Sequence, residues 1–385
     1  MRVEVRDNSN SVEKETAMER RARGRTHPSP GLAAGAVLFI CLGIGAMRSP
    51  AIADVPERLE RWLASQEWAR DTDGPILSLG KPGAFDDTHI FAPMVAVERG
   101  KESEKDRFLL WYCGSRGFAH DLSPTRTRDE RVFRLGLATS TDGKRFERHR
   151  GGAVYTLATE RLSILTPTVL RDGDGVPLRE DGALRMWFSS ATLGGGGQVQ
   201  SIQLATSADG VEWSSPSPVL IERAYAPSVI RSEKGYEMWY TVPGRYPWVM
   251  RHARSDDGLK WDVTEKPVLE ISQEWEHYLQ IYPAVSMIDG VYLMWYASYL
   301  SEDRLTTAIG FAASLDGVTW HKNPENPVLR PDPERAWESH YVSSQSVVRL
   351  RDGSFRMWYA SRKAPPFHNL YYALGTARWK GPEAD

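Results

Sequence analysis

Short apolar stretches recur along the chain, each with an aromatic pair near its centre. Their apolar positions are consecutive instead of alternating with polar ones, which is typical of strands in a sheet that is covered on both faces. The central phrases are Leu110-Trp111-Tyr112, Met186-Trp187-Phe188, Met238-Trp239-Tyr240, Met294-Trp295-Tyr296 and Met357-Trp358-Tyr359. Because one phrase returns in this way, the chain is predicted to consist of five copies of one structural unit.

Polar turn signals surround these phrases at regular positions. A Ser-x-Asp-Gly turn follows the first four, at Ser140-Asp142-Gly143, Ser207-Asp209-Gly210, Ser255-Asp257-Gly258 and Ser314-Asp316-Gly317. Asp-Gly between extended segments predicts a hairpin, because such turns need positive φ angles. A Pro-Val-Leu strand follows at Pro218, Pro267 and Pro327, and a further strand opens near Pro93, Pro167, Pro227, Pro283 or Gln345. Each unit therefore reads as four strands joined by turns, and we interpret the Asp-Gly turns as structural.

Five units of four strands predict an all-β fold, the five-bladed β-propeller, with four-stranded antiparallel blades. The blades are expected at approximately 85–157, 160–221, 223–270, 276–330 and 338–380, within a domain of residues 74–385. The last unit lacks Pro-Val-Leu, and the equivalent Pro75-Ile76-Leu77 stands before the first unit. We therefore expect an N-terminal strand near 75–80 to close the ring and remove an open edge. Residues 54–73, with Leu59, Trp62 and Leu63, are predicted to form a short amphipathic helix outside the ring.

Residues 1–53 have the order of an export signal. Arg20, Arg21, Arg23 and Arg25 precede an apolar run from Gly31 to Met47, and Ala51-Ile52-Ala53 supplies small residues for cleavage. We therefore expect a periplasmic or extracellular protein that has no membrane association after cleavage. An uncleaved membrane anchor through residues 31–47 is the alternative.

The composition excludes several classes of partner and cofactor. The chain carries 48 Lys and Arg against 50 Asp and Glu, and this balance argues against nucleic acid as a partner. Two cysteines, Cys41 and Cys113, provide neither a disulfide framework nor a cysteine zinc site. The nine histidines show no metal-binding spacing. We expect no cofactor, no catalytic metal and a monomer.

Candidate catalytic residues stand in the segments that lead into each unit's first strand. An aromatic-acid pair occurs at one fixed distance from that strand in three units, as Phe85-Asp86, Trp275-Glu276 and Trp337-Glu338. Glu160 holds the same offset, and Glu222 lies two positions nearer its strand. Paired carboxylates around a channel mouth are what glycosidic cleavage requires, as an acid and a base or nucleophile. The alternative is that these acids cap loops or form salt bridges with neighbours such as Arg335.

The sequence from Pro75 to Lys380 resembles the five-bladed propeller glycoside hydrolases of the arabinanase, invertase and levansucrase type, in families 43, 32, 68 and 130. The pattern Phe85-Asp86, Pro93, Trp111-Tyr112 and Ser140-x-Asp142-Gly143 carries the resemblance. By blade and loop, it implies Asp86 or the adjacent Asp87 as base and Glu276 as acid. Ala226 stands directly before Pro227, where family 43 has its pKa-tuning Asp, and Glu222 is a displaced substitute. The catalytic set is thus Asp86, Glu276 and Glu222, with Asp87, Glu338 and Glu160 as alternatives.

The loops between second and third strands share one side of a propeller, here named the loop face, with the connections between blades. Aromatic rings stack on sugars, and Arg or His binds hydroxyls or carboxylates, so side chains there suit a glycan and also an acidic one. These loops offer Arg116, His120, Tyr246, Trp248, Tyr299, Arg362, Lys363 and His368. We predict substrate binding by Arg116, Arg223, Tyr225, Trp248, His277, His340 and Arg362. The prediction is an exported glycoside hydrolase with a carbohydrate substrate; a non-catalytic glycan-binding propeller and a glycoside phosphorylase are the alternatives.

Overall fold

The computed structural model describes residues 55–101, 105–116, 131–157, 159, 161–193, 199–364 and 372–383. All described residues belong to one compact unit. The predicted export segment, Glu160, His120 and His368 lie outside the described residues. Within the described ranges, no helix is long and apolar enough to cross a membrane.

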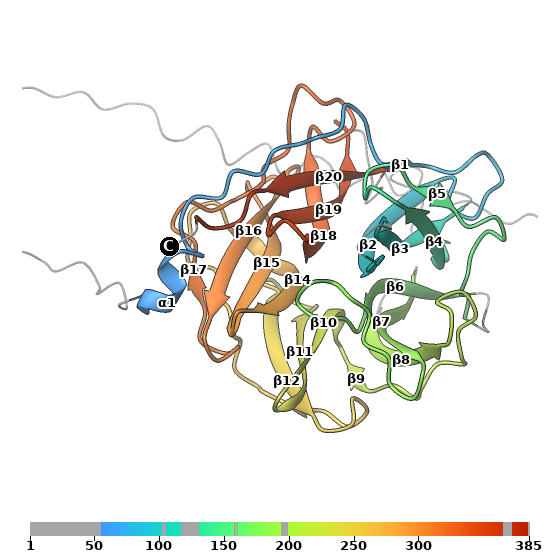
Figure 1. The fold of residues 1–385 in the computed structure, drawn as a ribbon, viewed down its shortest axis with the longest axis horizontal. Coiled ribbons are helices and arrows are strands. Elements are labelled where there is room, and N and C mark those ends of the chain that lie inside the picture. Colours follow the sequence, from blue (N-terminus) through green and yellow to red (C-terminus); the bar gives the residue numbers. More distant parts are fainter. Residues whose placement is uncertain are drawn as a thin grey trace, which may run out of the picture. The chain divides into compact units, whose positions relative to one another are not determined.

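Five four-stranded antiparallel sheets stand in a ring (Figure 1). Blade one consists of β2 (His89–Glu98), β3 (Arg107–Ser115), β4 (Arg134–Ser140) and β5 (Glu147–Arg148). Blade two consists of β6 (Leu162–Val169), β7 (Leu184–Thr192), β8 (Ser201–Ser207) and β9 (Ile221–Glu222). Blade three consists of β10 (Tyr225–Ser232), β11 (Gly235–Val242), β12 (Val249–Ser255) and β13 (Asp262–Val263). Blade four consists of β14 (His277–Ile288), β15 (Val291–Tyr299), β16 (Thr307–Ser314) and β17 (His321–Lys322). Blade five consists of β18 (Tyr341–Arg349), β19 (Phe355–Arg362), β20 (Ala373–Trp379) and β1 (Leu77–Ser78). The predicted five-bladed propeller is confirmed.

The tryptophan of each central phrase is fully buried and four of them tie one blade to the next. Their indole N–H groups donate to a glycine carbonyl at 2.8 to 3.0 Å, in the pairs Trp111 to Gly210, Trp187 to Gly258, Trp239 to Gly317 and Trp358 to Gly143. Each acceptor lies in the Ser-x-Asp-Gly turn of the following blade. The turns also bond within themselves, as where Ser255 Oγ accepts from the Gly258 N–H at 2.8 Å. The turns therefore hold the ring together.

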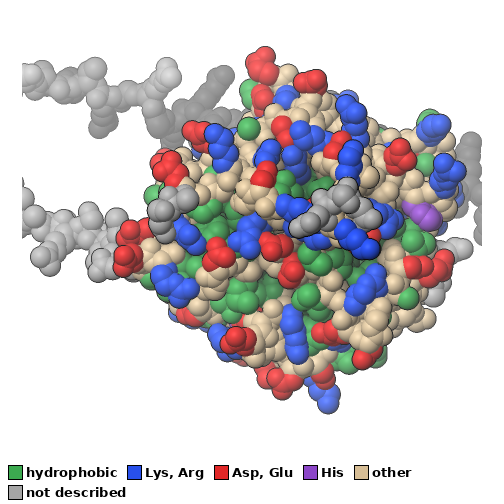
Figure 2. Space-filling view, in the orientation of Figure 1, with side chains coloured by type: hydrophobic (Ala, Val, Ile, Leu, Met, Phe, Trp, Pro, Cys, Tyr) green, Lys and Arg blue, Asp and Glu red, His purple; other side chains and the backbone are tan. Residues whose placement is uncertain are grey.

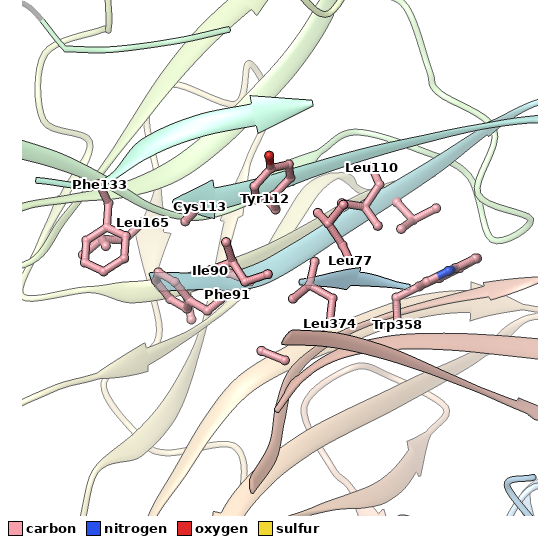
Figure 3. Packing of buried hydrophobic residues seen from close by; sticks show 14 of the residues in the cluster. Leu77, Ile90, Phe91, Leu110, Tyr112, Cys113, Phe133, Leu165, Trp358 and Leu374 are labelled. Atoms are coloured by element: carbon pink, nitrogen blue, oxygen red, sulfur yellow. The ribbon is translucent and has the colours of Figure 1, made fainter. Parts of the chain in front are cut away.

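The N-terminal segment closes the ring, as predicted. Strand β1 pairs with β20 in antiparallel register, with Leu77 opposite Leu374. Figure 3 shows these two leucines in the apolar core shared by blades one and five, together with Leu110 and Trp358. Since β1 is the fourth strand of blade five, the two ends of the described chain complete one sheet and remove an open edge.

Trp68, to which we assigned no role in closure from the sequence, reinforces this closure. Its ring meets Trp295 edge-on at 6.3 Å between centroids and 88°. Trp213 of a Ser-x-Asp-Gly turn meets Trp111 at 6.3 Å and 78°, so the geometry is equivalent. Trp68 therefore replaces the turn aromatic that blade five lacks.

The predicted N-terminal helix is reduced to one turn, α1 (Glu57–Glu60). Its apolar residues Leu59, Trp62 and Leu63 are buried, as expected of a packed face. Further along, the segment is extended because Ala69 exchanges two backbone hydrogen bonds of 2.8 Å with Arg378 of β20. Bonding to a strand edge replaces the helical bonds that we expected over residues 54–73.

Ion pairs add ties between blades. Arg349 of blade five contacts Asp174 of blade two at 2.6 Å and Asp289 of blade four at 3.2 Å. Arg351 contacts Asp106 of blade one at 2.8 Å. Figure 2 shows that Lys and Arg side chains are intermixed with Asp and Glu over one face of the ring. Most of these pairs are partly exposed, so each contributes little on its own.

Asp71 provides a pH-dependent contact of the closing segment. Burial raises its pKa, but Arg356 at 2.7 and 2.9 Å and Lys144 at 2.8 Å outweigh burial and lower the pKa from 3.8 to about 2. A lowered pKa stabilises the fold above the unfolded value, and this contribution is lost as pH falls through about 2. We expect Asp71→Asn to lower the free energy of unfolding by about 1–2 kcal/mol at pH 7. Urea unfolding should show the difference shrinking between pH 4 and pH 2, whereas a constant difference would contradict the ion-pair explanation.

Candidate functional site

Asp86 lies in a blade-internal cluster. Its side chain is 1% exposed, and its Oδ2 accepts hydrogen bonds from Tyr112 Oη and Arg148 Nε, both at 2.8 Å. Tyr112 lies in the second strand of blade one and Arg148 in the fourth. The carboxylate therefore joins three parts of one blade. A pocket of about 360 Å³ adjoins the cluster and is lined by Asp86, Tyr112, Arg134 and Arg148 among others.

Glu276 occupies the same position in blade four with more donors. Lys322 Nζ contacts its two carboxylate oxygens at 2.7 and 2.6 Å, and Tyr296 Oη donates at 2.8 Å. The backbone N–H groups of Ser272 and Gln273 donate at 2.8 and 3.0 Å. Burial raises the pKa of Glu276, but Lys322 and these donors outweigh it, so the pKa lies below its ordinary value. A general acid needs a raised pKa, so this environment does not favour that role.

Glu338 repeats the arrangement in blade five. Tyr359 Oη donates to it at 2.5 Å and Arg70 Nε at 2.6 Å, and Arg335 lies at 3.5 Å. Burial outweighs these contacts, so the pKa of Glu338 lies above its ordinary value. The side chain is fully buried.

The three clusters share a fourth component, a glycine on the third strand opposite the tyrosine. Tyr112 pairs with Gly136, and a Cβ on that glycine would lie 2.5 Å from the tyrosine ring. Tyr296 faces Gly310 and Tyr359 faces Gly375 in the same way. The other two blades pair Phe188 with Gln203 and Tyr240 with Arg251.

The parts of the cluster therefore occur together in three blades. The two blades without the tyrosine–glycine pair also have no aromatic residue before the acid that leads into their first strand. If the carboxylate serves to pack the blade together, the acid, the tyrosine, the cation and the glycine must all be present in the same blade. The contacts favour the structural alternative for Asp86, Glu276 and Glu338. Their catalytic role stays a prediction.

The other candidate acids are differently placed. Glu222 is exposed at the edge strand of blade two. Asp87 is half-buried beside the first strand of blade one, where Oδ2 accepts from the Gly83 N–H at 2.7 Å and Oδ1 accepts from Thr88 Oγ1 at 2.9 Å. None of the described candidates contacts another, so the structure does not bring an acid–base pair into hydrogen-bonding reach.

No carboxylate stands directly before the bend residues of the innermost strands, Pro93, Pro167, Pro227, Pro283 and Gln345. Each strand bends at a register shift, and the residue there has a positive φ: Ala92, Thr166, Ala226, Tyr282 and Ser344, at 47 to 58°. Such backbone is sparsely populated for non-glycine residues and is a feature of bulges near functional sites. Ala226, which the sequence resemblance aligns with the pKa-tuning Asp of family 43, is one of these residues of positive φ.

A cluster of basic side chains lies at the loop-face ends of blades one and five. His89, Arg131 and Arg362 are 3%, 6% and 1% exposed. Arg131 Nη1 lies 3.0 Å from His89 Nδ1, and the Arg362 guanidinium lies 3.1 Å from the centre of the Tyr341 ring. Burial, Arg131 and Arg362 together hold the pKa of His89 well below its usual range. Since a guanidinium only donates, His89 is neutral, accepts at Nδ1 and carries its proton on Nε2.

Aromatic side chains continue from this cluster across blades four and three. Tyr246 and Trp248 stack at 5.8 Å and 20°, and Tyr278 meets Tyr246 edge-on at 5.7 Å. Arg304 lies over Tyr246 at 4.8 Å and over Tyr278 at 4.2 Å. The Tyr341 hydroxyl donates to the Arg304 carbonyl at 3.1 Å and so connects both groups.

We name this continuous set the aromatic–arginine arc: Trp248, Tyr246, Tyr278, Arg304, Tyr341, Arg362, Arg131 and His89. Trp248, Tyr246 and Arg362 were expected from the sequence. The others were missed because they stand at strand starts and loop ends with no repeated spacing.

The remaining predicted binding residues lie outside the arc's contacts or at its edge. Arg116, Arg223 and Lys363 are exposed. Tyr225 is buried with its hydroxyl 3.3 Å from that of Tyr282, and His277 lies at the arc's edge with its ring 6.4 Å from Tyr278. His340 Nδ1 lies 3.0 Å from Ser339 Oγ, and Tyr299 lies 6.2 Å from Tyr341 between ring centres.

Comparison with known proteins finds the same fold in several glycoside hydrolases. No family model matches the sequence. A solved structure described as "Glycoside hydrolase" superposes with a TM-score of 0.62 at 16% identity and covers 82% of this chain and 93% of its own. A glycosyl hydrolase from Bacteroides ovatus gives 0.62 at 14% identity, over 84% of this chain and 95% of its own. A structure described under the words "The GH130 family of mannoside phosphorylases contains glycoside hydrolases that target beta-1,2 mannosidic linkages in Candida mannan" gives a TM-score of 0.60 at 16% identity, over 86% of this chain and 98% of its own. The fold is that of the five-bladed propeller glycoside hydrolases, and the resemblance seen in the sequence is confirmed at this level.

Two sequence relatives come from Mycobacterium tuberculosis. The uncharacterized proteins MT1551 and Rv1502 are each 30% identical over 225 residues, which is 55% of this chain and 67% of each relative. The protein belongs to the same family as these two.

Proposed function

We propose that this propeller recognises a glycan bearing acidic groups at its loop face. The observation that carries the proposal is the pair of buried arginines, Arg131 and Arg362, whose charges both act on neutral His89. Guanidinium groups present several donors in one plane and bind carboxylates through two parallel hydrogen bonds. A buried setting strengthens such bonds because water competes less for them.

The aromatic part of the arc supports a sugar ligand. Tyr246 is 40% exposed, stacks on Trp248 and lies next to the exposed Arg304. Ring faces of this kind pack against the apolar faces of sugars, while adjacent donors select hydroxyl positions. The arc therefore combines a stacking surface with cationic donors.

The fold neighbours also support carbohydrate. One neighbour is in complex with blood group B trisaccharide, one is described as a glycoside hydrolase, and one comes from work on glycoside hydrolases within a family of mannoside phosphorylases. Cleavage of a glycosidic bond is therefore the second candidate function. A panel of oligosaccharides and aryl glycosides, incubated with and without phosphate, separates the outcomes: new reducing ends mean hydrolysis, glycosyl phosphates mean phosphorolysis, and intact ligands mean binding alone.

We also propose that residues 1–53 direct export of the protein to the periplasm or the extracellular space. Basic, apolar and small residues follow one another there in the order of a signal sequence. N-terminal sequencing of the protein from its native host tests this directly. A new N-terminus at Asp54 would support cleavage, whereas an intact N-terminus in the membrane fraction would support an anchor.

Replacement of Arg362 tests the acidic-glycan proposal. Arg362→Met retains the stem but removes the charge, and we expect uronate-containing oligosaccharides to bind about 10- to 100-fold more weakly, which is the effect of one charge-assisted hydrogen-bonding group. Titration calorimetry with the same oligosaccharides before and after carboxyl reduction measures the effect. Arg150→Met, at an exposed arginine of blade one, is the matched control. Equal affinity for the native and carboxyl-reduced ligands would contradict the proposal.

A further inference from the structure

The propeller axis holds a cavity of about 250 Å³ that is separate from the aromatic–arginine arc. The innermost strands of all five blades line it, from the bend residues Pro93, Pro167, Pro227, Pro283 and Gln345 onward. None of the arc residues lines this cavity. At roughly 30 Å³ for each water molecule, the space equals about eight waters, so a small organic molecule fits.

The loop between β6 and β7 bounds the cavity on the side away from the loop face. Arg171 donates to the backbone carbonyls of Val95 in blade one and Val347 in blade five, the latter at 2.8 Å. A Cβ on Gly173 would lie 2.3 Å from the Met287 carbonyl oxygen of blade four, so only glycine permits this approach. Figure 1 shows the loop reaching toward the middle of the ring. Contacts with three other blades make this boundary rigid.

Gln345 presents an acceptor that the protein does not use. Its Nε2 donates to the carbonyls of Tyr282 at 2.7 Å and Trp295 at 2.8 Å, so both amide hydrogens are committed and the orientation of the amide is determined. The side chain is 6% exposed, and within the described part of the chain nothing donates to Oε1. A buried amide oxygen is expected to accept at least one hydrogen bond, so a bound donor is required.

Hydroxyl groups supply the complementary donors. Ser228 Oγ accepts from the Val285 N–H at 2.9 Å and Ser346 Oγ from the Val95 N–H at 3.1 Å, which leaves each hydroxyl hydrogen for another acceptor. Thr168 and Ser286 add two more hydroxyls to the lining and are also buried. Of the charged lining residues, Asp172 and Arg231 are exposed, and the part-buried Arg171 is committed to the backbone carbonyls of Val95 and Val347.

We infer that the axial cavity is a second binding site, for a small neutral polyhydroxy compound such as a polyol or a monosaccharide. Such a ligand donates a hydroxyl to Gln345 Oε1 and accepts from the hydroxyls of Ser228, Ser346 and Thr168. A neutral ligand matches the amide and hydroxyl groups of the lining, because Arg171 already donates to two backbone carbonyls and a buried net charge on the ligand would lack a partner. The site is independent of the acidic-glycan proposal, which concerns side chains at the loop face that do not line this cavity.

Saturation-transfer NMR on the full chain with glycerol and myo-inositol as probes tests this site. We expect transfer to at least one probe with a dissociation constant of about 1 mM or tighter. Ala284→Leu places a larger side chain in the cavity lining and should abolish the transfer. Thr168→Val keeps the shape but removes one hydroxyl and should weaken binding about fivefold. If Ala284→Leu does not fold, Thr168→Val still tests the site.

Arg362→Met is the cross-control, since it should weaken acidic glycans and leave the polyol signal unchanged. Transfer that persists in Ala284→Leu would place the probes elsewhere and overturn the inference. Absence of transfer in the wild type would overturn it as well, because the cavity would then hold ordered water alone. Failure of either kind leaves the acidic-glycan proposal intact, since that proposal depends on different side chains.

Discussion

Trp68→Ala should lower the free energy of unfolding by about 3–5 kcal/mol, the usual range for truncating a buried tryptophan. Trp68 is 8% exposed and packs on Trp295 and Trp379, with ring centroids at 6.3 and 5.9 Å. It supplies blade five with the turn aromatic that the other described blades carry on their own turns. Loss of the ring therefore leaves a cavity at the junction where the two chain ends meet. Urea unfolding followed by tryptophan fluorescence and circular dichroism measures the change.

Trp68→Phe is the matched variant for this test. It keeps an aromatic edge against Trp295 and should cost less than about half as much. Wild-type stability of Trp68→Ala would show that the ring closes through β1 alone. A lower stability together with oligomers in gel filtration would show in addition that the opened sheet edge pairs with other molecules.

Glu276→Gln separates the architectural from the catalytic role of the shared carboxylate cluster. If the cluster is a packing unit, the variant leaves the buried Lys322 ammonium without its carboxylate, and we expect a loss of about 3–5 kcal/mol in the free energy of unfolding. The Lys322 side chain is 9% exposed and the Glu276 side chain is fully buried, so water cannot replace the carboxylate as the partner of the ammonium group. Denaturant unfolding at pH 7 gives the measurement.

The double variant Glu276→Gln with Lys322→Met should recover part of that loss, since both charges are then absent. Glu222→Gln, at an exposed carboxylate, should remain within about 0.5 kcal/mol of wild type. If Glu276→Gln has normal stability and abolishes cleavage of a glycoside in the substrate panel, the catalytic assignment holds and the architectural explanation is wrong.

The segment that closes the ring contains a sequence repeat from which more of its structure could have been predicted. Trp68, Arg70 and Pro75 have the same spacing as Trp320, Lys322 and Pro327 in blade four. The N-terminal segment is therefore a displaced copy of the last turn and strand of a unit. Pro75-Ile76-Leu77 was recognisable by its phrase, but Trp68 was not, because no Asp-Gly turn precedes it. We therefore expected a helix across this segment.

The candidate carboxylates show where sequence reasoning ends. Asp86 and Glu276 stand at matching positions before a first strand, and this placement agrees equally with a channel-mouth acid and with a packing unit. The deciding partners are distant in sequence, since Arg148 lies 62 residues from Asp86 and Lys322 lies 46 residues from Glu276. Only the return of the fourth strand to the same blade brings each cation to its acid.

The sequence by itself determined the propeller, its number of blades and its closing strand, because each blade repeats local signals: consecutive apolar residues, Asp-Gly turns and a proline or glutamine at the bend. Hydrophobic periodicity and turn chemistry are short-range properties, so they can be read along the chain. Tertiary structure alone decided which charged groups are buried with which partners. The arc from Trp248 to His89 and the acceptor at Gln345 arise where several blades meet, and the pKa of a carboxylate or imidazole there depends on burial and neighbouring charges that no local pattern encodes.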